Sequence, residues 1–224
     1  MADVRPSGAV DDRVARQVAL LLLAALCFSS AALPASDLAE LVDGKRYEEL
    51  RALGPGIMEE LAELYRSRDD PAQRERVAWA FYQLGWRSEE AAAALLPDVE
   101  GEIVEPGLKI SAQYALGRVS NDPMIVKVLL RNLRHSRGLR IRDKAACALA
   151  YDQIHLTPAQ KALLFRGLIS ALDDEKPDVR RIALQALEIH TGQRKGYDPN
   201  APREERLEAI GAWYRWLSEY ESQL

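Results

Sequence analysis

The sequence predicts an all-α protein, an α-solenoid in which similar helix pairs repeat along the chain and a capping helix ends the array. Two observations support this prediction. The chain has 224 residues but only 13 Gly, and Ala, Leu, Glu and Arg dominate. These four residues have high helix propensity. In addition, a motif of small and apolar residues recurs at a period of 33–38 residues.

The recurring motif is found by aligning the chain with itself. Its first alanines are Ala78, Ala112, Ala145 and Ala183, and their spacing lies in the range of helical solenoid repeats. In the last three copies, an apolar residue stands four positions earlier and an Ala-Leu pair follows three positions later. These offsets put the motif on one face of a helix. Small side chains there would let stacked helices approach closely.

Capping signals mark the predicted helix starts. Asp70, Asp122 and Thr157 each precede a proline, which is tolerated at the first helical position because the N–H it lacks has no partner there. Thr157 and Gln160 also have the spacing of a capping box. The second repeat departs from the pattern. We expect its first helix to be short (residues 88–96) and to precede a longer loop, because prolines and glycines follow it.

Several segments resemble HEAT repeats of the bacterial type. Residues 173–187 have an acidic turn, then Asp-Val-Arg-Arg, then the Ala and Leu face. Residues 53–71 resemble the helix that opens such a repeat. Residues 190–217 resemble the closing segment of some exported bacterial HEAT-repeat proteins. The resemblance implies about four HEAT-type helix pairs. Tetratricopeptide repeats are the alternative architecture, although the Asp-Val-Arg-Arg motif and the proline positions favour HEAT.

A helix over residues 203–222 is expected to cap the array, since a solenoid end must bury one side and expose the other. Its predicted apolar stripe consists of Leu207, Ile210, Tyr214 and Leu217. Trp213 and Trp216 flank this stripe. They either pack against the array or contact a partner, because Trp is favoured at interfaces.

Residues 1–35 are predicted to be a targeting segment. Arg13 and Arg16 precede an uncharged apolar run from Val18 to Phe28, and the small residues of SSAALPA follow. This order is typical of a secretory signal peptide. An uncleaved membrane anchor is the alternative. The helical array would then comprise residues 36–224 and lie in the periplasm or on the outer face of the membrane.

Charge is unevenly distributed along the chain. Residues 36–105 hold 17 acids and 8 bases, whereas residues 127–144 hold seven bases and one acid. Guanidinium groups on such a ridge can hold carboxylates or phosphates. Alternatively, the ridge pairs with acids of the first two repeats or is solvated surface. Nucleic acid is not expected, because the patch is short and lacks aromatic residues. The candidate binding residues are Arg131, Arg134, Arg137, Arg140 and Arg142.

Motifs for catalysis or metal binding are absent from the sequence. His135, His155 and His190 are isolated, and no Gly-rich phosphate loop or GxSxG elbow occurs. Cys147 lies in an Ala-rich helical stretch and is expected to be a buried small hydrophobe. We therefore expect no catalytic residues, no cofactor and no metal.

The sequence thus favours a non-catalytic scaffold, exported or membrane-anchored, that binds a protein or peptide along one face of the solenoid. One alternative is a binder of anionic ligands that uses the arginine-rich block at residues 127–144. The other is an enzyme similar to the HEAT-like bilin lyases, which share the repeats but have no motif that can be matched in this chain.

Cleavage of the targeting segment is testable on the protein isolated from its native host. Mass spectrometry of the mature N-terminus should give a start near Ala32, Leu33 or Ser36, because small residues precede these positions. Recovery of an intact Met1 would contradict cleavage and support the membrane anchor.

Overall fold

Helices make up the regular structure of Ala35–Leu224, the residues that the computed structural model describes. This part of the chain has eleven α-helices, one 3-10 turn and no strand, which confirms the all-α prediction. Within it, no helix is both long and apolar enough to cross a membrane. The predicted signal or anchor falls almost entirely in residues 1–34, outside the described residues. The elements are α2 (Ala35–Asp43), α3 (Tyr47–Ala52), η1 (Pro55–Ile57), α4 (Met58–Ser67), α5 (Pro71–Leu84), α6 (Glu89–Glu100), α7 (Pro106–Val119), α8 (Pro123–His135), α9 (Leu139–Tyr151), α10 (Pro158–Ala171), α11 (Pro177–Thr191) and α12 (Arg203–Ser222).

The helix starts confirm the predicted capping signals. Asp70 and Asp122 each accept a hydrogen bond from the N–H two residues ahead, at 3.3 and 2.8 Å. Thr157 and Gln160 form the capping box: the hydroxyl of Thr157 accepts from the N–H of Gln160, and the side chain of Gln160 accepts from the N–H of Thr157. Each cap satisfies backbone donors that have no partner within the helix.

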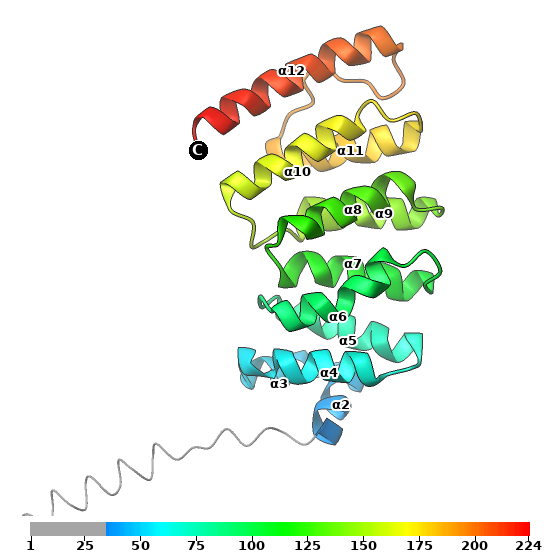
Figure 1. The fold of residues 1–224 in the computed structure, drawn as a ribbon, viewed down its shortest axis with the longest axis vertical. Helices are drawn as coiled ribbons and strands as arrows, with labels where there is room; N and C mark the ends of the chain where they lie inside the picture. Colours follow the sequence, from blue (N-terminus) through cyan, green and yellow to red (C-terminus); the bar gives the residue numbers. More distant parts are fainter. Residues whose placement is uncertain (1–34) are drawn as a thin grey trace, which may run out of the picture. The chain divides into compact units, whose positions relative to one another are not determined.

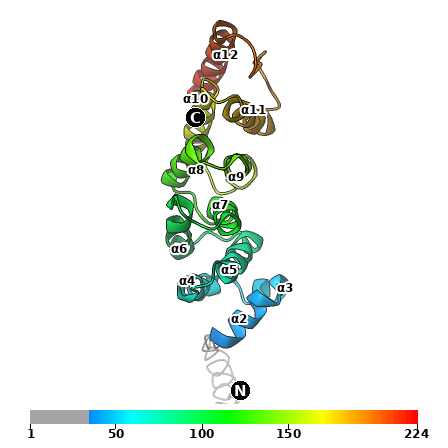
Figure 2. The ribbon, with the colours of Figure 1, turned by 90° about the vertical axis from the view of Figure 1, so that its right-hand side faces the viewer.

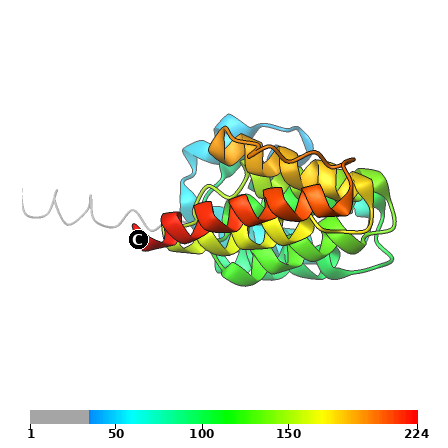
Figure 3. The same ribbon diagram turned by 90° about the horizontal axis from the view of Figure 1, so that it is seen from above.

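The helices pack as successive antiparallel pairs, α4 with α5, α6 with α7, α8 with α9 and α10 with α11 (Figure 1). Each first helix contacts the first helix of the next pair, and each second helix contacts the next second helix. Two rows result, α4, α6, α8 and α10 on one side and α5, α7, α9 and α11 on the other (Figure 2). At the ends, α2 and α3 pack on α5, and α12 lies along α10 (Figure 3).

The alanines of the recurring motif lie on the buried face of each second helix. All of them are fully or almost fully buried, which confirms the predicted helix face. They are Ala78, Ala112, Ala115, Ala145, Ala148, Ala183 and Ala186. A methyl group lets neighbouring helices approach closely, while the leucine of each Ala-Leu pair is fully buried and fills the layer.

Helix α6 is longer than expected. It runs to Glu100 and contains Pro97, where the sequence predicted a loop. Proline removes one backbone hydrogen bond from the helix interior. The last turn is nevertheless held: the carbonyl of Pro97 accepts from the N–H of Gly101 at 2.9 Å, Val99 is buried, and Asp98 accepts from the Tyr65 hydroxyl. Tertiary contacts therefore outweigh the cost of the proline.

The buried face of α12 is rotated from the predicted stripe. Ile210, Trp213 and Leu217 are buried, whereas Leu207 and Tyr214 are 42% and 41% exposed. Helical spacing fits both sets, since each contains residues three and four apart. Trp213 has the largest apolar surface of these residues, and its burial sets the orientation of the helix.

A close approach of α8 and α10 depends on Gly167. A Cβ atom at this position would lie 2.1 Å from Cδ1 of Leu130, so Gly167→Ala should lower the free energy of unfolding by about 1–3 kcal/mol. Gly211 on α12 is the matched control, because its nearest neighbour is a guanidinium nitrogen of the Arg215 side chain, at an ordinary contact distance of 3.5 Å. Gly211→Ala should instead stabilise by about 0.5–1 kcal/mol, since alanine is the better helix former. Urea denaturation measures both changes, and effects of the same sign would contradict this packing.

Candidate functional site

The five arginines predicted as one binding ridge have different roles. Arg134 is paired with Asp174 at 3.1 Å, and Arg142 is paired with Asp178, to which its Nε donates at 3.0 Å. Both acids belong to the following helix pair. The alternative that the block pairs with acids of the first two repeats is therefore wrong for these two residues. Their charges connect α8 and α9 to the α10–α11 turn and to the start of α11.

The remaining arginines of the block are exposed, and two of them line a cavity of about 280 Å³. Arg131 and Arg137 lie on its wall, and Arg131 is also 3.5 Å from a carboxylate oxygen of Glu100. His135 lines the same cavity. Arg140 does not line it. The structure thus retains Arg131 and Arg137 as candidate ligand-binding residues.

Lys109 of α7 joins these residues in the cavity wall and was missed by the sequence analysis. Its side chain is buried, and its ammonium group donates to the carbonyl of Gly101. Burial lowers the pKa of Lys109, and the nearby Arg131 lowers it further. A signal was present, since a lysine between the buried Leu108 and Ile110 is unusual.

Aromatic side chains gather on the outer side of the second-helix row. The rings of Trp79 and Tyr82 on α5 meet edge to face at 5.3 Å, and both lie near Tyr114 on α7, at 6.1 and 5.9 Å. The guanidinium of Arg118 covers the Tyr82 ring at 4.2 Å. The three rings are partly exposed. They form a half-buried apolar cluster on one surface.

The apolar surface continues onto α9 and α11 as a shallow groove of about 20 Å³. Tyr151 and Ile189 border it and are 59% and 37% exposed. Cys147 also lines the groove and is half-buried rather than buried as expected. Burial raises the pKa of the Cys147 thiol, and nearby Asp143 raises it further. A nucleophilic thiolate is therefore disfavoured.

The groove residues occupy equivalent positions of the repeat. Tyr114, Cys147 and Gln185 are the residues immediately before the second alanine of the motif, and Arg118, Tyr151 and Ile189 follow four residues later. These positions face away from the buried alanines. The large residues at most of these equivalent positions were the signal in the sequence for this apolar surface. The signal becomes visible only after the repeats have been aligned.

The two tryptophans, which were expected either to pack against the array or to contact a partner, both pack in the C-terminal part of the fold, where Trp213 is buried and Trp216 is half-buried. Trp213 has no exposed surface, so it is not available to a partner. The Trp216 ring meets Phe165 of α10 edge to face at 5.2 Å and stacks on Tyr220 at 5.7 Å. The contact between Trp216 and Phe165 attaches α12 to α10.

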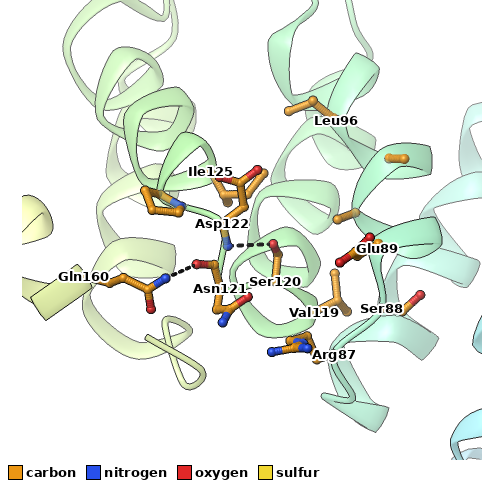
Figure 4. A pocket seen from close by; sticks show the side chains of 13 residues that line it. Arg87, Ser88, Glu89, Leu96, Val119, Ser120, Asn121, Asp122, Ile125 and Gln160 are labelled. Carbon is orange, nitrogen blue, oxygen red and sulfur yellow. Dashed lines mark hydrogen bonds between the residues drawn. The ribbon is translucent and has the colours of Figure 1, made fainter. Parts of the chain in front are cut away.

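A larger hollow of about 530 Å³ lies between α6, the α7–α8 turn and the start of α10 (Figure 4). Several of its polar groups hold the turn in place. The hydroxyl of Ser120 accepts from the N–H of Asp122 at 3.0 Å, and the amide of Gln160 donates to the carbonyl of Asn121 at 2.8 Å. Arg87 and Glu89 of opposite charge stand at its rim (Figure 4).

Two histidines bind backbone carbonyls. His155 contacts the Gly85 carbonyl at 2.9 Å, and His190 contacts that of Leu149 at 2.9 Å. Burial lowers the pKa of His190. Among residues 35–224, no three His, Cys, Asp or Glu side chains are placed to hold a metal ion. These histidines fasten one helix pair to another.

Asp152 is a buried carboxylate that accepts a hydrogen bond from Arg118 at 3.0 Å. Burial raises its pKa to about 6, against the opposing effect of Arg118. The folded protein therefore holds this proton more tightly than the unfolded chain does, and this group reduces stability as the pH rises from about 4 to about 6.

The effect of Asp152 can be isolated with Asp152→Asn. Thermal melts of both proteins should be recorded between pH 4 and pH 7. Because only the wild type carries the titrating carboxyl, its melting temperature minus that of the variant should fall as the pH rises. A difference that stays constant with pH would show that the pKa of Asp152 is unshifted.

Comparison with known proteins provides no family for this arrangement. The chain matches no family model, and none of the curated proteins is significantly similar to it.

Proposed function

We propose that the chain is a HEAT-type helical scaffold that binds a segment of another protein along the outer side of α5, α7, α9 and α11, and that it catalyses no reaction. The HEAT assignment is supported by the pairwise packing of the helices and by the burial of the motif alanines on one face of each second helix. Arrays of this kind bind ligands on extended surfaces.

The observation that carries the proposal is the continuity of the apolar face. The aromatic cluster of Trp79, Tyr82 and Tyr114 is linked through Cys147, which neighbours Tyr114, to the groove bordered by Tyr151 and Ile189. A run of exposed and half-exposed apolar side chains across several helices is typical of an interaction surface. Aromatic residues contribute strongly to binding energy in such surfaces.

The size of the groove favours a protein segment over a small molecule. Its volume of about 20 Å³ is far below the roughly 300–1,000 Å³ of typical small-molecule pockets. Its floor is formed by Ala146, Ala150 and Ala186, so it suits the tip of one apolar side chain. An extended peptide with apolar residues could place such a side chain there and lay others on the aromatic cluster.

We propose no catalytic step because these potentially reactive side chains are engaged or not activated. His155 and His190 are engaged by backbone carbonyls, and the pKa of Cys147 is raised. General base and nucleophilic catalysis need such groups free and activated.

The proposal also includes export directed by residues 1–35, or their retention as a membrane anchor. This part rests on the sequence alone.

Peptides selected from a displayed random library on the wild-type protein provide the test. We expect an apolar consensus whose affinity falls about tenfold or more when Tyr151 and Ile189 are both changed to Asp, because burying a charge in the groove is unfavourable. Leu163→Asp is the matched control. Leu163 is 44% exposed but lies on α10, in the other row of helices.

Circular dichroism melts should confirm that all variants remain folded. Equal loss of affinity in the groove variant and in Leu163→Asp would contradict the proposed face, as would unchanged affinity in the groove variant.

A further inference from the structure

The cavity beside α7 and α8 has an unusual charge at its floor. Lys109 is only 5% exposed, and within the described part of the chain no carboxylate lies within ion-pair distance of it. Its one hydrogen-bond partner is the carbonyl of Gly101. An ammonium group can donate three hydrogen bonds. Buried charges in proteins are normally paired, so this one is incompletely compensated.

The acids near the cavity do not neutralise Lys109. Glu100 lies 3.5 Å from Arg131, and its side chain is 44% exposed. Glu102 is exposed and acts on the pKa of Lys109 only through a weaker Coulomb attraction, which opposes burial. Three cationic groups, Lys109, Arg131 and Arg137, thus face two acids around one cavity.

The turn that carries Arg137 is held in place by another arginine. Arg142 donates to the carbonyls of Ser136 and Arg137, at 2.8 and 3.2 Å, and is itself paired with Asp178. Arg142 therefore positions the turn instead of facing a ligand. A rigid backbone at Arg137 reduces the conformational entropy lost when its side chain engages an anion.

We infer that this cavity binds the phosphoryl group of a small phosphate monoester, held by Lys109, Arg131 and Arg137. A phosphoryl group carries about −1.5 to −2 charges and three acceptor oxygens, which matches three donors that reach the cavity from α7, α8 and the α8–α9 turn. A carboxylate has only two acceptor oxygens, one fewer than the three donor groups. The volume of about 280 Å³ admits a phosphoryl group with a small substituent.

The inference is independent of the proposed peptide-binding face, because the two sites share no residue. The aromatic cluster and groove lie on the outer side of the second-helix row, whereas the cavity involves the C-terminal ends of α6 and α8. The variant with Asp at positions 151 and 189 should therefore bind phosphate as the wild type does.

Isothermal titration calorimetry of the wild-type protein with inorganic phosphate and with glycerol 3-phosphate should give saturable binding at one site. Arg137→Gln should weaken it about tenfold or more, because a charge-assisted hydrogen bond is lost. Glu102→Gln should strengthen it, by about two- to fivefold, because a repelling charge is removed. Arg140→Gln is the matched control, with the same charge change three residues from Arg137, and should alter affinity by less than about twofold.

Three results would overturn the inference. Absence of saturable binding to either phosphate compound would exclude the site. Equal weakening by Arg140→Gln and Arg137→Gln would show diffuse electrostatic attraction. Tighter binding of succinate than of glycerol 3-phosphate would assign the cavity to carboxylates. Lys109→Met, checked for folding by thermal melts, should abolish phosphate binding if Lys109 forms the floor of the site.

Discussion

The close approach of neighbouring second helices is the constraint on which the rest of the structure depends. A Cβ atom at Gly117 of α7 would lie 2.6 Å from Nε2 of Gln153, just after α9, and the motif alanines Ala112, Ala145 and Ala183 are fully buried on the inward faces of α7, α9 and α11. Their burial fixes which face of each helix is turned inward. Residues on the outward side of these helices, including Tyr114 and Tyr151, are consequently left at the surface. The packing of the core therefore also determines which residues form the candidate binding face.

Ion pairs between a buried acid and a partly exposed arginine link the helix pairs and form a second layer of organisation. Arg74 and Asp98, Arg118 and Asp152, and Arg134 and Asp174 each join a residue of one pair to a residue of the next. Buried ion pairs add little net stability, because desolvation offsets their attraction. They do penalise any other alignment, since a shifted helix would leave a buried charge unpaired. Their contribution is therefore to specify the register of neighbouring pairs.

Much of the fold could be predicted from the sequence, because helices, caps and the alanine motif depend on residues close together in the chain. Thr157 and Gln160 illustrate this, as their capping box is entirely local. The rotation of α12 could not be predicted, since two stripes fitted helical spacing and only the burial of Trp213 in the folded protein distinguishes them.

The candidate sites were less predictable than the fold, for the same reason. The arginine-rich block was visible as composition, but which of its charges are engaged depends on acids about 40 residues away, such as Asp174 for Arg134. Lys109 lies outside the block and reaches the cavity only because α7 packs between α6 and α9. Local sequence thus indicates the presence of charge, and tertiary structure decides whether the charge is available.

The bond between His155 and the Gly85 carbonyl has a consequence for how the protein opens. Helices elsewhere make their main contacts with adjacent pairs, an arrangement that lets an array fray stepwise from its ends. His155 instead reaches across α7, from the loop after α9 to the end of α5. This hydrogen bond links the first pair directly to the loop after the third, so the two pairs cannot separate without breaking it.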